Sequence, residues 1–281
     1  MKRTLFILLS VFFLVGFTYK ETGDPTPREV LEKMISTAMN LKTVRYEMKI
    51  SERVNNKMLD AGSRVKLNVS PRKIYLKIPK IEAELLWVQG WNDGDALVNP
   101  NAFPYINLNL DPYGYFLRKD QHHTINELGF TYMASLLAGS MKQAGEKFDN
   151  YCSYTSEKWN GHDCYKVIVE NPEFKHYNYI AKQGETVVSI ARKLFISEFM
   201  VIENNPTLDY YTKLKAGKKI SVPAYYSKKM VMYIDKQLSL PVNIKIYDEK
   251  GLFESYEYVT IVVNPKFAED EFSTKFKDYN F

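Results

Sequence analysis

Histidine and cysteine are the side chains that most readily bind metals or act as nucleophiles, and this chain of 281 residues has four of the former and two of the latter. His122 and His123 are adjacent, so their side chains point in different directions on a strand or a helix. His162 and His176 have no cysteine or carboxylate at the spacing of a metal-binding motif. The pattern predicts structural or solvated histidines, with no metal site and no cofactor.

Pairs of carboxylates are a second possible source of chemistry. Glu82 and Glu84, like Asp93 and Asp95, occupy alternate positions of expected strands and turns, where charged side chains usually face solvent. A glycosidase needs two carboxyl groups at a set separation across a cleft, and nothing in the sequence indicates that arrangement. The sequence also lacks the motifs of serine hydrolases, zinc proteases and nucleotide-binding proteins. We therefore predict that the protein is not an enzyme and has no catalytic residue.

The two cysteines flank a predicted hairpin. Asn160-Gly161 is a strong signal for a two-residue turn, and a turn centred there places Glu157 opposite Cys164. Cys152 then lies five residues further along, on the other face of its strand. We expect the cysteines to be unbridged in a regular hairpin, although a bulge before Thr155 would let them pair.

Composition and the N-terminus indicate an exported, sheet-rich protein. The chain has 21 Tyr and 16 Phe, which favour strands, and its net charge of +5 is too small to predict a nucleic-acid partner. Lys2 and Arg3 precede a mostly apolar run from Leu5 to Phe17, which is short for a membrane span. We therefore expect residues 1–20 to be a signal peptide and the mature chain to lie in the periplasm or cell envelope. The cleavage site is poor, so an uncleaved segment remains possible and is the only membrane contact expected.

The pattern of apolar residues predicts a sheet with two covering helices. Thr26 to Glu29 form a capping box that begins a helix ending near Asn40. From Thr43 to Leu110 apolar residues recur with a period of two, which predicts antiparallel strands. A second capping box, Thr124 to Glu127, is expected to begin a helix that ends at Gly139 or Gly145. Strand alternation resumes at about residues 151–170 and 230–263.

A helical stretch from about His176 to Ser227 interrupts the strands. Residues 179–191 read YIAKQGETVVSIA, and they are followed by Asn205-Pro206, Leu214, Gly217 and a closing strand KISVP. This order and spacing resemble those of a LysM domain, a small β-α-α-β module of cell-wall proteins. Thr186 and Ser197 are also good N-caps for the two short helices. We predict an inserted LysM module at residues 176–227, separable from its host.

The resemblance implies a glycan-binding site. LysM modules bind N-acetylglucosamine units of peptidoglycan or related glycans in a groove between the loop that enters the first helix and the loop that leaves the second. Here these loops contain Gly184, Glu185, Thr186 and Val187, and Asn205, Pro206, Thr207, Leu208 and Asp209. Unpaired N–H groups at a helix N-terminus would suit a neutral acetamido sugar. The alternative is that Thr186 and Asn205 only cap a helix and form a turn.

Residues 21–175 and 228–281 would form the host domain. Its segments KQLSLPV at 236–242 and DEKG at 248–251 resemble the strand-turn-strand ending of LolA/LolB-like lipoprotein carriers. The resemblance implies an α+β fold, namely an antiparallel half-open β-barrel packed with helices, whose concave face can hold acyl chains. An ordinary sheet core would show the same aromatic alternation.

Our first hypothesis is noncatalytic binding of peptidoglycan through the LysM module, which would localise the host domain at the wall. The alternative is a periplasmic carrier or sensor of a lipid or lipoprotein, with a hydrophobic ligand in the host domain and the module as a tether. A wall hydrolase is a third possibility that no motif supports.

Overall fold

The computed structural model describes residues 23–103 and 105–281, so the expected signal peptide at residues 1–20 lies outside the described part. Within that part, eleven strands form one antiparallel sheet. In sheet order they are β6 (Leu108–Leu110), β5 (Ala96–Asn99), β4 (Ala83–Val88), β3 (Lys73–Ile78), β2 (Lys57–Asn68), β1 (Thr43–Val54), β13 (Gly251–Val263), β12 (Pro241–Asp248), β11 (Lys229–Asp235), β8 (His162–Glu170) and β7 (Cys152–Trp159). The predicted large antiparallel sheet with few helices is confirmed.

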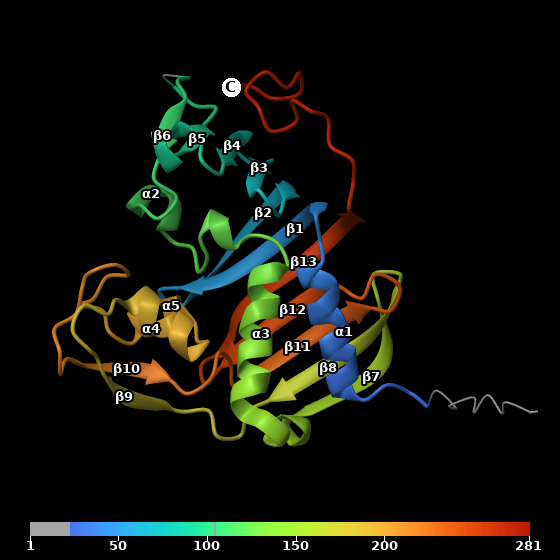
Figure 1. Ribbon diagram of the computed structural model, residues 1–281, viewed down its shortest axis with the longest axis vertical. Helices are drawn as coiled ribbons and strands as arrows, with labels where there is room; N and C mark the ends of the chain where they lie inside the picture. Colours follow the sequence, from blue (N-terminus) through green and yellow to red (C-terminus); the bar gives the residue numbers. More distant parts are fainter. Residues whose placement is uncertain (1–22, 104) are drawn as a thin grey trace, which may run out of the picture.

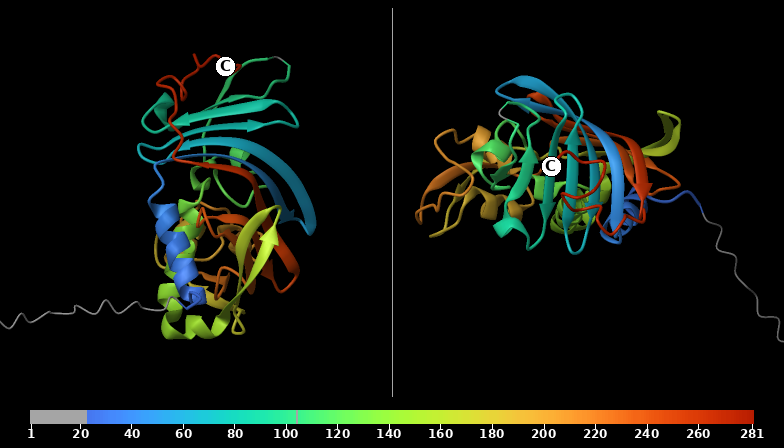
Figure 2. Two further views of the ribbon diagram at one scale, coloured as in Figure 1. Left: turned by 90° about the vertical axis from the view of Figure 1, so that its right-hand side faces the viewer. Right: turned by 90° about the horizontal axis from the view of Figure 1, so that it is seen from above.

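The sheet is strongly bent, and two helices cover part of its concave face (Figures 1 and 2). These are α1 (Pro27–Met39) and α3 (Thr131–Ala144), whose apolar faces share one core with the inward side chains of the strands. The shorter elements are η1 (Asn92–Gly94), α2 (Tyr115–Arg118), η2 (Ile125–Glu127) and η3 (Gly145–Tyr151). Among the described residues, no helix is both long and apolar enough to cross a membrane.

The two capping boxes have different outcomes. Thr26 and Glu29 cap α1 reciprocally, as predicted, and Asn40 is its C-cap. The box at Thr124 caps only the turn η2, so the predicted start of the second helix is wrong. Gly129, which lies between η2 and α3, interrupts the helical path with a φ of +93°. A β-carbon at this position would lie 2.6 Å from Leu67. The helix α3 begins after this turn and ends at Gly145, one of the two predicted ends.

The hairpin of β7 and β8 has the predicted register. Glu157 pairs with Cys164, and Cys152 pairs with Val169 at the other end of the strands. Both cysteines are free, because the register keeps them apart.

Residues 176–223 form a smaller unit with the order β9 (His176–Ile180), α4 (Val187–Leu194), α5 (Glu198–Glu203) and β10 (Lys219–Pro223). The strands β9 and β10 pair antiparallel, and α4 and α5 pack with them around a separate small core. Thr186 and Ser197 cap the two helices, as expected. We call this unit the small module; it lies beside α3 and one end of β1 (Figure 1).

The small module is also packed into the main core. Met200 of α5 is buried in the same cluster as the sheet and α3, and Phe195 and Phe199 pack against that cluster. A shared core does not fit the expectation of a freely separable module, because removing the segment would uncover apolar surface.

Candidate functional site

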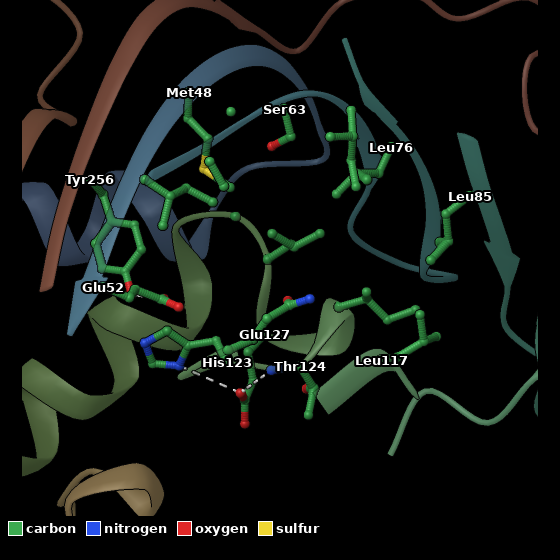
Figure 3. A pocket seen from close by; sticks show the side chains of 18 of the residues that line it. Met48, Glu52, Ser63, Leu76, Leu85, Leu117, His123, Thr124, Glu127 and Tyr256 are labelled. Atoms are coloured by element: carbon green, nitrogen blue, oxygen red, sulfur yellow. Dashed lines mark hydrogen bonds and ion pairs between the residues drawn. The ribbon is translucent and has the colours of Figure 1, made fainter. Parts of the chain in front are cut away.

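A cavity of about 370 Å³ lies between the concave face of β1 to β4 and the segment that links α2 to α3 (Figure 3). Apolar side chains make up most of its wall: Met48, Ile50, Leu59, Leu76, Ile78, Leu85, Leu117, Ile125, Leu128 and Met133. Leu59 is 42% exposed, and Lys119 and Asp120, which also line the cavity, are exposed too, so the cavity is open to solvent at these residues. Its size lies within the usual range of small-molecule sites.

Strand alternation and small residues create this space. Met48 and Ile50 lie on the same face of β1, and Ser63 of β2 pairs directly with Met48. Ala61 and Ser63 leave room that larger side chains would fill. The buried hydroxyl of Ser63 has no hydrogen-bond partner among the described residues, which leaves a polar contact available in the wall.

The cavity has one polar end, formed by Glu52, His123, Thr124, Glu127 and Tyr256 (Figure 3). The hydroxyl of Tyr256 donates to Oε1 of Glu52 at 2.7 Å. Oε2 of Glu127 accepts from the N–H of Thr124 at 2.9 Å and lies 3.5 Å from Nδ1 of His123. An apolar body with a polar end matches a molecule that has an apolar chain and a polar head.

Electrostatic contacts favour the charged forms of His123 and of the neighbouring Glu254 at this end. Burial alone would lower the pKa of His123, but hydrogen bonds and charges from Glu127 and Glu254 raise it well above its usual value. Burial alone would raise the pKa of Glu254, and contacts with His122 and His123 instead hold it far below its usual range. The polar end therefore carries fixed charges in a mostly apolar surrounding.

His122 lies behind the polar end and joins the small module to the sheet. Its ring is sandwiched between Phe199 of α5 and Phe253 of β13, at centroid distances of 4.1 and 4.2 Å. Nδ1 lies 2.8 Å from Oε2 of Glu254, and Nε2 lies 3.0 Å from the carbonyl oxygen of Arg53.

Buried ion pairs also join the module to the host. Arg118 pairs with Glu198 of α5 at 3.1 Å, and both side chains are almost fully buried. Arg192 of α4 lies 3.4 Å from Glu127 and 3.3 Å from Glu198. These pairs fix α4 and α5 next to the polar end of the cavity.

The first predicted glycan-binding loop is occupied by internal contacts. The N–H of Gly184 donates to the carbonyl of Leu214 at 3.0 Å, and the N–H of Thr186 donates to Oγ of Ser189 at 2.9 Å. Glu185 accepts from the Tyr179 hydroxyl and pairs with Lys193, while Val187 is buried in the module core. The expectation of free backbone donors does not hold for Gly184 or Thr186, because these N–H groups already have partners.

Two side chains of the second predicted loop, Asn205 and Asp209, also make hydrogen bonds within the module. The side chain of Asn205 bridges α5 and β10 by bonding the carbonyls of Val201 and Ser221 and the N–H of Ser221. Asp209 accepts from the N–H groups of Tyr211 and Thr212. Leu208 packs on the module core, Thr207 is exposed, and Pro206 and Asp209 border a groove shared with the host. The contact of the Thr186 side chain is that of a cap, as in the alternative, whereas Asn205 also links α5 to β10 through Ser221.

The absence of motif spacing did not reveal that three of the histidines contact carboxylates far away in the sequence. His162 lies 2.7 Å from Asp235, His176 lies 3.3 Å from Glu249, and His122 contacts Glu254. Glu84 is likewise buried rather than solvent-facing, since it bonds Asn280 near the C-terminus. Each of these partners is at least 70 positions away in the sequence. Motif spacing therefore gave no signal for them.

The part of the chain that matches a known family includes strands of the large sheet and the first half of the small module. A family model described as "Protein of unknown function (DUF1571)" matches residues 42–199, which is more than half of the chain. The match begins at β1 and ends within α5. No curated protein sequence matches the chain.

Solved structures show weak overall similarity. MucB is 10% identical over 88% of this chain and 62% of its own, with a TM-score of 0.42, so the chain spans less than two thirds of MucB. The lipoprotein LppX of Mycobacterium tuberculosis is 11% identical over 88% and 99%, with a TM-score of 0.39. A LolA superfamily protein from Nitrosomonas europaea is 9% identical over 89% and 98%, with a TM-score of 0.33. Similarity at this level carries no functional argument.

Proposed function

The chain belongs to the DUF1571 family of proteins of unknown function, and from that premise we propose that it is a noncatalytic binding protein for a hydrophobic ligand with a polar head. The ligand would occupy the cavity on the concave face of the sheet, with its apolar part against β1 to β4 and its head at Glu52 and His123. The chemical class that fits is a lipid with one acyl chain or a hydrophobic molecule of similar size.

The observation that carries the proposal is an apolar cavity inside an otherwise packed sheet domain. At about 24 cal/mol per Å³, an enclosed empty cavity of about 370 Å³ would cost roughly 9 kcal/mol. That cost is comparable to the whole stability of a typical domain. Water entering at the open rim offsets part of it, but water gains few hydrogen bonds from apolar walls. A bound apolar chain would replace the missing contacts.

A paired substitution on β2 tests the proposal. Ser63→Phe directs a ring into the cavity, whereas Arg64→Phe places the same ring on the opposite, exposed face of the strand. Binding of a fluorescent fatty-acid analogue to the delipidated protein should weaken at least tenfold in Ser63→Phe and stay within about twofold in Arg64→Phe. Equal affinity in both variants, with both folded by circular dichroism, would refute the cavity as the binding site. Mass spectrometry of the purified chain should also find a co-purifying hydrophobic molecule.

Export and glycan binding remain predictions beside this proposal. We expect the chain to act in the cell envelope, because residues 1–20 have the pattern of a signal peptide. Peptidoglycan binding by the small module is supported by its LysM-like sequence and its β-α-α-β order. Sedimentation of the full chain with insoluble peptidoglycan tests it: Thr186→Arg should abolish sedimentation if the predicted loops bind glycan. Unchanged sedimentation would exclude them.

A further inference from the structure

Three buried side chains from distant parts of the chain converge next to the cavity. They are Glu52 of β1, His122 of the segment before η2, and Glu254 of β13. One ligand atom from each lies within 4.8 Å of those of the other two, and all three residues are buried. An imidazole with two carboxylates is a donor set that suits divalent transition metals.

The hydrogen bonds of His122 leave its other nitrogen directed at a carboxylate oxygen. Nε2 faces the carbonyl of Arg53, which can only accept, so Nε2 carries a hydrogen. Nδ1 faces the carboxylate oxygen Oε2 of Glu254 at 2.8 Å. If the ring is neutral, two lone pairs face each other there. A metal cation bonded to both atoms, which would hold them slightly further apart, would remove this contact between lone pairs.

The charges around the cluster favour a further cation. Among the described residues, no lysine or arginine forms an ion pair with Glu52 or Glu254, and His123, which lies 3.5 Å from Glu254, is shared with Glu127. The guanidinium of Arg53, the nearest along the chain, pairs with Asp248 and Glu203. One shared imidazole does not balance the buried carboxylates, whereas one divalent ion would neutralise both Glu52 and Glu254.

The surroundings orient the three groups as metal ligands are usually oriented. A ligating histidine typically donates its second N–H to a backbone carbonyl or carboxylate, as His122 does to Arg53. The rings of Phe199 and Phe253 hold the imidazole from both faces. Glu52 accepts from the N–H of His122 at 3.0 Å and from Tyr256, while Glu254 accepts from Tyr226 at 2.8 Å.

We propose that Glu52, Nδ1 of His122 and Glu254 bind one divalent cation of the zinc class. Glu52 also lines the cavity, so the cation would reach the site from there, and its fourth position would be left to water. The site does not depend on the proposed lipid binding, because it is formed by the protein alone.

Titration of the untagged, chelator-treated full chain with Zn²⁺ tests the proposal. We expect one ion per chain with micromolar or tighter affinity and a protein melting temperature that rises by several degrees. Glu52→Gln and His122→Gln should each weaken binding at least tenfold. The matched control is His162→Gln, which alters a histidine–carboxylate pair with no second carboxylate and should bind like the wild type.

X-ray absorption of the bound zinc keeps the test decisive if a buried variant fails to fold. The wild-type spectrum should contain only nitrogen and oxygen ligands, with at least one imidazole. A sulfur ligand would assign the ion to Cys152 or Cys164 and overturn the proposal. So would millimolar affinity, which indicates adventitious binding only, or unchanged affinity in a folded Glu52→Gln variant. Fatty-acid binding measured separately on the same samples distinguishes failure of this site from failure of the lipid proposal.

Discussion

The ring of Phe195 lies directly against Gly139 of α3, so closely that a β-carbon on this glycine would be 2.2 Å from the ring. Phe195 ends α4 of the small module, whereas Gly139 lies in the middle of a helix of the main core. Since only a residue without a side chain permits this approach, the contact explains a glycine in a helix interior, where it normally destabilises. It also shows that the module docks at a specific place.

Gly139→Ala should destabilise the protein, although alanine is the better helix former. Propensity alone predicts a gain of ~1 kcal/mol, whereas overpacking typically costs about 1–3 kcal/mol. We therefore expect a net loss of up to about 2 kcal/mol in urea unfolding, because Phe195 must move. Adding Phe195→Leu should restore part of the loss. A stabilised Gly139→Ala protein would contradict the observed contact.

Replacing residues 176–227 by a short Gly/Ser link should disrupt the host domain. The link itself is feasible, because Glu170 and Lys229 pair across β8 and β11. The loss of Met200 and Phe199, however, uncovers the main core, and the loss of Glu198 leaves Arg118 buried without its carboxylate. We expect increased binding of a hydrophobic dye and a broadened thermal transition. A deletion protein as stable as the full chain would show that the module is separable after all.

The ion pair of Arg118 and Glu198 should be far more sensitive than an exposed one. Removing one partner of a buried pair typically costs about 3–5 kcal/mol, because the other charge stays buried. Arg118→Met should therefore cost several kcal/mol, and the double variant Arg118→Met with Glu198→Gln should cost less than the single one. Arg64→Met is the control, since Arg64 and Glu47 form an exposed pair for which ~0–1 kcal/mol is expected. Chemical denaturation of all four proteins measures these differences.

Asp235 should contribute stability that disappears in acid. Burial alone would raise its pKa, but hydrogen bonds from the N–H groups of Leu238 and Gln237 and from His162 lower it below its usual value. Because the folded-state pKa is the lower one, the stabilisation is present above the ordinary value of 3.8 and is lost as the pH falls through the folded-state value.

We therefore expect Asp235→Asn to cost ~1–3 kcal/mol at pH 7, as for hydrogen bonds to a charged group, and less at pH 3. Asp163→Asn, which removes an exposed pair with Lys158, should change little at either pH. Urea unfolding at the two pH values provides the comparison. An equal cost at pH 7 and pH 3 would show that the carboxylate charge does not contribute.

Features set by neighbouring residues could be predicted from the sequence alone. The capping box at Thr26 and the turn at Asn160-Gly161 involve groups within four positions of each other, so their geometry follows from the local chain. The period-two alternation likewise predicted the large antiparallel sheet, because each strand must bury one face. The sequence also predicted the order of strands and helices in the small module.

Features that depend on distant residues were decided only by the tertiary structure. The box at Thr124 caps only the short η2 rather than α3, and Gly129 beyond it has a φ of +93° and passes close to Leu67, more than 60 positions away. The cavity exists because small residues on β2 meet large ones on β1, β3 and β4, and its polar end joins residues 52, 123, 127 and 256. No period or spacing in a sequence encodes the distance between such groups, since sheet curvature and helix docking bring them together. The sequence determined those elements whose ends depend on neighbouring residues, and only packing decided which charges face one another and which space is left empty.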